Sequence, residues 1–431
     1  MPPETASWTL PGLVLTDLTL EVPLDHDRPE GPRLSVFARV AAAEGGADRP
    51  YLVYLQGGPG FEAPRPALES PSPSWLPRAL EDFQVVLLDQ RGTGRSTPVG
   101  LDVVLPAGAI PGAATLREAA PEDQAAYLAH FRADAIVRDA EAVRAALGAR
   151  SWSLLGQSFG GFTTLRYLSE HADRLDLTLF TGGLPVIGPR LDEVYTTTWE
   201  GMVRRSEEFY ARFDGDRDRM RRLADLARAG ELVLQDGQAV SPDRLRTVGH
   251  LLGASGGAER LHYLLELDPV SPAFRQALAD ALPFGGANPI YTVLHESCWA
   301  DGQATRWAAD RTMPEQVRAD PTLLAGEHVH RSLLDEDPQL APWKEVADIL
   351  AEHEWPALYD SEALRAAQVP GAAAVYFADA YVPAQYSLET AALLPKLRPW
   401  VTSEYEHNGL RASGDGVFTH LLDLARGRRT A

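Results

Sequence analysis

The strongest chemical signal in the sequence is a serine between two glycines, in the segment LLGQSFGGF at residues 154–162. The G-x-S-x-G spacing around Ser158 is typical of a nucleophile on a sharp turn between a strand and a helix. Small neighbours leave room for a strained backbone, and the following helix would direct free N–H groups toward an anion. A glycine-rich turn without chemistry has the same spacing, so a nucleophile at Ser158 requires an oxyanion site, an acid and a base elsewhere.

Donors for an oxyanion site are expected in a second glycine-rich turn, LQGGPG at residues 55–60. Two adjacent glycines and a proline favour a rigid turn with outward N–H groups, and an oxyanion hole needs such donors in place before the reaction. We therefore expect the N–H groups of Gly58 and of Phe159, the residue after the serine, to form the oxyanion hole. The alternative is an ordinary turn at the exit of a strand.

The acid and the base are sought after the serine, because the chain order in this kind of site is serine, acid, histidine. His407 stands in EYEHNG, where a strand pattern ends at Asn-Gly, whereas His420 lies in the helical pattern VFTHLL and is expected to be a packed or surface side chain. Asp379 ends the strand pattern AAAVYFAD. Alone, Asp379 would be interpreted as a strand cap and His407 as a solvent histidine. In this order, at successive strand ends, they are predicted to complete a triad with Ser158.

The elements that must position these residues alternate between strands and helices. Short β-branched or aromatic runs between turn-rich stretches predict strands at residues 18–26, 33–40, 51–57 and 85–89. A helix is predicted over 123–148, followed by a strand at 152–157, a helix from residue 159 and a strand at 175–183. Such alternation indicates an α/β protein with a parallel sheet.

The alternation stops near Pro185 and resumes near Val369. The segments between these points are mostly helical and are interrupted by prolines and glycines. Strand patterns return at 370–379 and 398–407, and residues 415–427 have the pattern of a closing amphipathic helix. We predict a mostly parallel central sheet interrupted by a helical cap, with a core at 1–186, the cap at 187–368 and the rest of the core at 369–431.

Composition excludes several classes of function. The chain has 431 residues, of which 45% are hydrophobic, and a formal net charge of −20. Nucleic acids and anionic membranes bind clustered basic residues, so neither is expected as a partner. The sequence shows no apolar run of membrane-spanning length and no secretory signal pattern. The single cysteine, Cys298, cannot form an internal disulfide, and we expect a cytoplasmic protein.

Metal and phosphate sites are disfavoured by their spacing requirements. HESCW at 295–299 begins like the zinc motif H-E-x-x-H, but Trp299 stands where the second histidine is required. His328 and His330 are two residues apart and have no obvious third ligand. GTGRS lacks the Gly-Lys-Ser/Thr ending of a phosphate-binding loop. We expect neither a metal nor a cofactor.

Several short motifs together carry a family resemblance. They are GGPG (57–60), DQRGTGRS (89–96), GQSFGG (156–161), FADAYV (377–382) and EYEHNGLR (404–411). In this order and spacing they resemble the prolyl aminopeptidases (proline iminopeptidases) of the α/β-hydrolase superfamily. HESCW and AGEHV (325–329) resemble cap segments of the longer branch of that family. The resemblance covers about residues 15–427. Gln56 departs from it, since many members have histidine there, but the donors in this turn are backbone groups and we expect no loss of activity.

The resemblance implies an α/β-hydrolase fold with an inserted helical cap, and removal of an N-terminal proline from peptides without a metal or cofactor. Ser158 would be the nucleophile, His407 the general acid and base, and Asp379 the group that orients the histidine. Asp89 and Arg91 resemble structural residues of a loop near the oxyanion turn.

Substrate recognition is expected to depend on carboxylates in the cap, because an aminopeptidase must bind a free N-terminal ammonium. By resemblance the candidates are Glu296 and Glu327, and a pair would give two charge-assisted hydrogen bonds to a prolinium nitrogen. The reserve candidates are Glu193 and Glu200, and the aromatic residues that could line a slot for the proline ring are Phe159, Tyr195 and Trp299. A general carboxylesterase and a catalytically inactive binding protein stay open as alternatives.

Overall fold

The computed structural model describes residues 3–69 and 72–430 of the chain. Its core is a nine-stranded sheet with the order β1-β2-β3-β5-β4-β6-β7-β8-β9. The strands are β1 (Glu4–Leu10), β2 (Leu13–Pro23), β3 (Arg33–Ala43), β4 (Tyr51–Leu55), β5 (Gln84–Asp89), β6 (Trp152–Gln157), β7 (Leu175–Thr181), β8 (Gly371–Tyr376) and β9 (Leu397–Thr402). The first three strands and the β3–β5 pair are antiparallel, and the pairs from β5 to β9 are parallel. The predicted α/β organisation with a mostly parallel sheet is confirmed.

The central strands are buried because helices cover both faces of the sheet. Every residue of β5, β6 and β8 is buried. Side chains of α3 (Ala133–Ala146) and α4 (Phe159–His171) belong to the core on one face, and those of α1 (Leu76–Ala79) and α18 (Gly416–Ala425) belong to the core on the other. These parallel strands therefore have continuous apolar sequences, which is why their positions follow from the sequence.

The N-terminal edge of the sheet differs from the prediction. The sequence analysis does not predict β1, which is an edge strand formed by ETASWTL in which no residue is buried. The strand predicted at 18–26 is the second half of β2, which begins at Leu13 after a turn at Gly12.

The helix predicted over 123–148 is two helices, α2 (Pro121–Leu128) and α3. Between them the chain leaves the helical conformation at Arg132, whose φ and ψ are −93° and 175°. The buried Arg132 guanidinium donates to the carbonyl oxygens of Ala300 and Pro356 at 3.3 and 3.1 Å. A contact with a distant segment thus overrides the local helical pattern.

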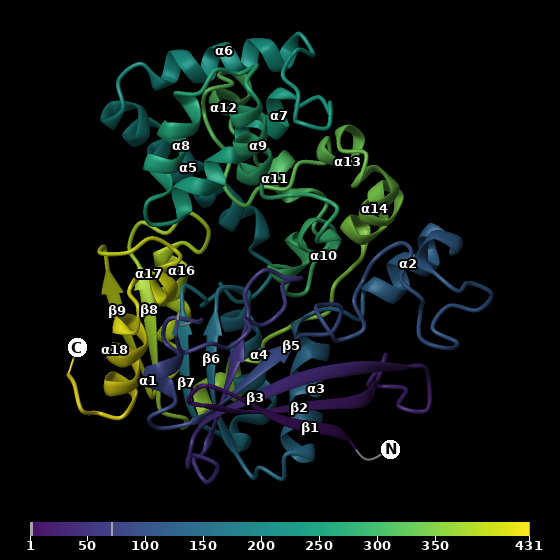
Figure 1. Cartoon of the computed structure of the whole chain (residues 1–431), viewed down its shortest axis with the longest axis vertical. Coiled ribbons are helices and arrows are strands. Elements are labelled where there is room, and N and C mark those ends of the chain that lie inside the picture. The colour runs from purple at the N-terminus through teal and green to yellow at the C-terminus, as the bar shows by residue number, and fades with distance from the viewer. Residues whose placement is uncertain (1–2, 70–71, 431) are drawn as a thin grey trace.

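Between β7 and β8 the chain forms the helical layer drawn in teal and green in Figure 1. This layer lies beyond the edge of the sheet toward which β6 and β7 point. Its elements of five or more residues are α5 (Leu191–Arg212), α6 (Asp216–Arg228), α7 (Pro242–Arg246), η3 (Thr247–Gly253), α8 (Gly257–Leu265), α9 (Pro272–Ala281), α10 (Pro289–Val293), α12 (Glu315–Ala319), α14 (Lys344–Glu352) and α15 (Ser361–Ala366). We call residues 187–368 the cap and keep these bounds as a prediction. Across residues 3–69 and 72–430, no helix combines the length and apolar character needed to cross a membrane.

Candidate active site

Ser158 occupies a strained turn between β6 and α4. Its φ and ψ are 54° and −125°, a left-handed backbone that is costly for a residue other than glycine. The turn is fixed by two hydrogen bonds, from Ser158 N to Thr181 O at 3.0 Å and from Gly161 N to Ser158 O at 2.7 Å. Strain of this kind persists only where the surrounding structure enforces it, and it is typical of the nucleophile turn that the sequence predicts.

The glycines around Ser158 allow α4 to pack closely on the sheet. A Cβ atom at Gly160 would lie 1.8 Å from the carbonyl oxygen of Leu55, and one at Gly161 would lie 2.3 Å from that of Gly183. Gly156 is similarly close to Gly160, with 2.4 Å between a Cβ and the carbonyl oxygen. The glycines in GQSFGG are therefore required by backbone contact.

Replacing Gly160 by alanine should strongly destabilise the protein, because α4 would have to move away from β4. We expect the free energy of unfolding to fall by about 3 kcal/mol, or the chain to fail to fold. Denaturant unfolding followed by circular dichroism measures this change. Gly285→Ala is the matched control, since a Cβ atom there meets no atom within 4 Å. Equal losses in both variants would contradict the close packing.

Asp379 and His407 lie on the loops after two adjacent parallel strands, β8 and β9. Asp379 Oδ2 is 2.8 Å from His407 Nδ1, and Asp379 Oδ1 accepts from the backbone N–H groups of Tyr381 and Val382 at 2.9 and 3.1 Å. Both strands are shorter than predicted, since β8 ends at Tyr376 and β9 at Thr402. The structure therefore brings the two side chains into contact, from loops rather than from strand ends, and their roles as acid and base stay predictions.

The environment of His407 suits a general base. Burial opposes protonation of the ring, but the carboxylates of Asp379 and Glu327 outweigh it, so that the pKa of His407 is raised above its ordinary value. Nε2 is buried and has no hydrogen-bond partner among the described residues. With Nδ1–H directed at Asp379, Nε2 carries the free lone pair that proton abstraction requires.

This raised pKa predicts the acidic limb of the pH profile. Catalysis needs neutral His407, so kcat/KM for an uncharged ester should fall on acidification with a midpoint above 6.5, the ordinary histidine value. In Asp379→Asn, burial and the positive charge of Arg411 still lower the pKa of His407, and only the carboxylate of Glu327 still raises it. The midpoint of the residual activity should therefore move downward. Initial rates across the pH range measure both midpoints. A wild-type midpoint below 6.5 would contradict the assigned environment.

The turn LQGGPG follows β4 and lies against the serine. A Cβ atom at Gly57 would be 3.0 Å from Ser158 Cβ. The Gln90 side chain donates to the carbonyl oxygen of Gln56 at 3.0 Å and so ties this turn to the loop after β5. The Gly58 and Phe159 amides have no protein acceptor within the described part of the chain. Their role as oxyanion donors stays a prediction.

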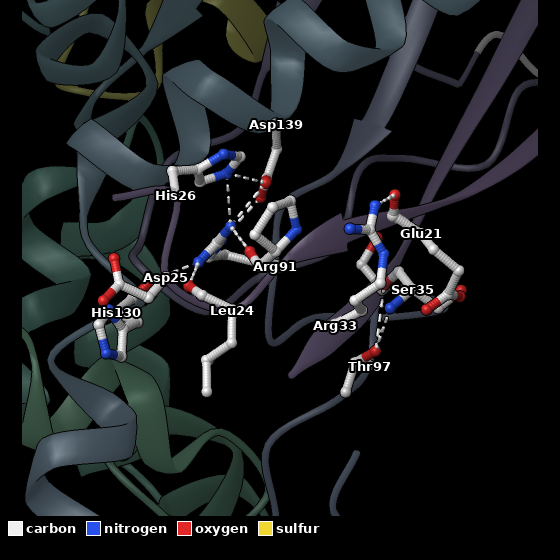
Figure 2. A network of polar contacts seen from close by, with 12 residues as sticks. Glu21, Leu24, Asp25, His26, Arg33, Ser35, Arg91, Thr97, His130 and Asp139 are labelled. Carbon is white, nitrogen blue, oxygen red and sulfur yellow. Dashed lines mark hydrogen bonds and ion pairs between the residues drawn. The ribbon is translucent and has the colours of Figure 1, made fainter. Parts of the chain in front are cut away.

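Asp89 and Arg91 hold the loop after β5 in place. The fully buried Arg91 side chain donates to Asp139 at 2.7 and 2.6 Å and to the carbonyl oxygens of Leu24 and His130 at 2.8 Å (Figure 2). Asp89 accepts two hydrogen bonds from Arg65, at 3.0 and 2.9 Å. The residue between them, Gln90, is therefore fixed where its side chain reaches the turn LQGGPG.

A small pocket in the cap adjoins His407. Its walls come from α5, from two cap segments and from the loop after β8, and they comprise Val194, Tyr195, Thr198, His295, Trp299, Glu327, His328, Ala380 and Tyr381. The Tyr381 ring packs edge-on against the His407 ring, with 4.9 Å between centroids. Three of the candidate substrate residues, Tyr195, Trp299 and Glu327, thus lie around one pocket.

Glu327 is the charged group of this pocket. Its carboxylate accepts from the Tyr291 hydroxyl at 2.7 Å and lies 3.8 and 3.9 Å from the imidazole nitrogens of His250 and His295. Burial would raise the pKa of Glu327, but the neighbouring histidines, His407 included, outweigh it and lower the pKa to about 2. The carboxylate therefore stays ionised.

Glu296, the other glutamate of the predicted pair, is not among the residues that line this pocket. Its carboxylate accepts from the backbone N–H groups of Ala308 and Ala309 at 3.1 and 2.9 Å, at the start of α11 (Ala308–Arg311). Burial outweighs these bonds and raises the pKa of Glu296 to about 7. The reserve candidates are on the exterior, since Glu193 is 55% exposed and pairs with Arg190, and Glu200 is exposed. Among the acidic candidates, Glu327 is the one beside His407.

The sequence reasoning missed the residues around Glu327. His250 lies on η3 and Tyr291 on α10, and His295 follows Tyr291 by four residues, so no local pattern connects His250 with the other two. Tyr381 had a local signal, because it follows Asp379 by two residues and donates its backbone N–H to that carboxylate.

Three further histidines, His328, His330 and His420, contact other side chains. His328 contacts the Thr198 hydroxyl at 3.0 Å, and His330 contacts Asp310 at 2.7 Å. His420 contacts Arg429 at 2.8 Å and stacks on Trp400, on the outer side of α18. In residues 3–69 and 72–430, no group of three or more His, Cys, Asp or Glu side chains is arranged to hold a metal ion.

The parallel sheet, the strained serine turn and the His407–Asp379 pair define the class of α/β hydrolases. The alpha/beta hydrolase fold family matches residues 50–235. A bromoperoxidase structure from Bacillus anthracis is similar at 15% identity and a TM-score of 0.41, covering 95% of this chain and 99% of that chain.

Two relatives specify the family within this class. The chain is 41% identical to a proline iminopeptidase from Aeromonas sobria, over 94% of this chain and 95% of that protein. It is 31% identical to a proline iminopeptidase from Aspergillus aculeatus, over 95% and 93%. The chain belongs to the proline iminopeptidase family, as its motifs predict.

Proposed function

We propose that this chain is a serine aminopeptidase that releases proline from the N-terminus of peptides. The observation that carries the proposal is Glu327, an ionised carboxylate in a small pocket that shares Tyr381 with the His407 environment. A substrate ammonium would pair with this buried anion, whereas a neutral ester has no group that needs it. The two proline iminopeptidase relatives support the same assignment.

In the proposed reaction, Ser158 Oγ attacks the carbonyl carbon of the N-terminal proline while His407 Nε2 takes the serine proton. The N–H groups of Gly58 and Phe159 hold the negative charge that develops on the carbonyl oxygen. His407 gives the proton to the leaving amine, so that the peptide C–N bond breaks and a prolyl ester remains on Ser158. His407 then takes a proton from a water molecule that attacks this ester, and it returns the proton to Ser158 Oγ as the acyl–oxygen bond breaks and proline is released. Asp379 keeps the ring oriented throughout.

Recognition of the amino terminus is assigned to the cap pocket. Glu327 accepts one N–H group of the prolinium nitrogen in a charge-assisted hydrogen bond. The Tyr195 hydroxyl is buried and has no partner among the described residues, so we assign it the second N–H group. Trp299, which packs on Phe162 at 4.6 Å between ring centroids, forms an apolar wall for the proline ring. The cap bounds, a cytoplasmic location, and independence from metal ions and cofactors stay predictions from the sequence.

The test uses short peptides that differ in their first residue. Mass spectrometry and amino-acid analysis should show proline release from Pro-Ala-Ala, slower release of other first residues, and no internal cleavage. A small neutral ester measures the activity of the triad in parallel. Ester hydrolysis without proline release would favour the carboxylesterase, and loss of both would favour an inactive binding protein.

A further inference from the structure

A single cap arginine contacts both loops that carry the acid–base pair. Arg205 lies on α5, and its side chain is 9% exposed. Its Nε donates to the carbonyl oxygen of Ala378 at 3.0 Å, and its Nη2 contacts that oxygen and the carboxylate of Glu406. Its Nη1 donates to the carbonyl oxygen of Leu252, within the cap, at 2.9 Å.

The two core partners of Arg205 directly precede the proposed acid and base. Ala378 is followed by Asp379, and Glu406 is followed by His407. The loops that hold these residues follow different strands, β8 and β9, and the 2.8 Å contact between Asp379 and His407 depends on their spacing. A planar guanidinium donates in several fixed directions, so one side chain can define the distance between two loops.

We propose that Arg205 is a positioning residue for the reaction, which holds the acid loop and the base loop together from the cap. The proposal rests on the proposed triad. Through Arg205, the cap would position Asp379 and His407 for the reaction, in addition to binding the substrate.

Two other hydrogen bonds also join the cap to these loops. Ser255 N donates to the Asn408 side chain at 2.9 Å, next to His407. The Tyr381 hydroxyl, two residues after Asp379, contacts the carbonyl oxygen of His250 in the cap. Each of these contacts reaches one loop, whereas Arg205 reaches both.

The test compares two substrates in purified Arg205→Met. We expect kcat to fall about 100-fold for both a proline peptide and a small neutral ester, with KM nearly unchanged, because a displaced acid–base pair slows attack on either. Arg205→Lys should recover part of the loss, since lysine keeps the positive charge but lacks the planar guanidinium that donates in several fixed directions. Arg246→Met is the matched control. Arg246 is also a buried cap arginine that donates to a backbone carbonyl, that of Val317, but it does not contact either loop.

The outcomes separate this proposal from the proposed function. Wild-type kcat on both substrates in Arg205→Met would overturn the positioning role. A loss confined to the proline peptide would also overturn it, because Arg205 would then act through Leu252 on the cap pocket around Glu327. Failure of the wild-type protein to release proline would reject the aminopeptidase assignment, while ester hydrolysis would still measure the effect of Arg205→Met.

If Arg205→Met does not fold, Glu406→Gln replaces it, with an expected fall in kcat of about 10-fold on both substrates. Unchanged rates in Glu406→Gln would then overturn the proposal.

Discussion

Replacing Ser158 by alanine is expected to lower proline release by roughly 10⁴-fold or more, because the covalent route through the serine is lost. The protein should stay folded, since alanine keeps the Cβ atom and removes only the hydroxyl. Initial rates with a proline peptide, together with a thermal unfolding curve, measure both effects. Residual activity within about 10-fold of wild type would exclude Ser158 as the nucleophile.

Histidine variants provide the matched comparison. His407→Ala should cause a loss of similar size, because neither the serine proton nor the leaving amine would have its proton carrier. His420→Ala should be mild, since that ring stacks on Trp400 and contacts Arg429 away from the site. If His420→Ala abolished turnover while His407→Ala did not, the base would be wrongly assigned.

Glu327→Gln is expected to weaken proline release while sparing ester hydrolysis. Glutamine can still accept the hydrogen bond from Tyr291, so the variant removes mainly the charge. Loss of this partner for a buried ammonium should cost about 2–4 kcal/mol in kcat/KM, or roughly 30- to 1,000-fold. A neutral ester has no ammonium to pair and should react at nearly the wild-type rate.

Two further glutamates serve as controls for Glu327. Glu193→Gln alters an exposed carboxylate on α5 and should change neither activity. Glu296→Gln should lower stability rather than select between substrates, because that carboxylate binds the start of α11. Equal losses on peptide and ester in Glu327→Gln would show that Glu327 supports folding or the triad instead of the amine.

The central sheet and the triad candidates could be predicted because their signals are local. Buried parallel strands have continuous apolar sequences, and their order places Ser158, Asp379 and His407 after strands that meet at one edge of the sheet. The glycines beside Ser158 reflect backbone contacts that admit no side chain, so they also appear directly in the sequence.

The parts that escaped prediction depend on contacts between distant segments. The break before α3 follows from the buried bonds of Arg132 to Ala300 and Pro356, which no local pattern shows. Glu296 and Glu327 occupy similar family-like motifs, yet only the fold shows that one binds a helix terminus and the other faces the pocket. Arg205 has no motif at all, since its partners follow it by more than forty positions.

The most direct test of the account compares kcat/KM of the unmodified protein for prolyl 4-nitroanilide and for N-acetylprolyl 4-nitroanilide. The two substrates share the reacting carbonyl, the ring and the leaving group, and they differ in the charge that Glu327 is proposed to bind. The account predicts a preference of at least roughly 100-fold for the free amine, and a much smaller preference in Glu327→Gln. Equal values of kcat/KM for the two substrates would contradict it.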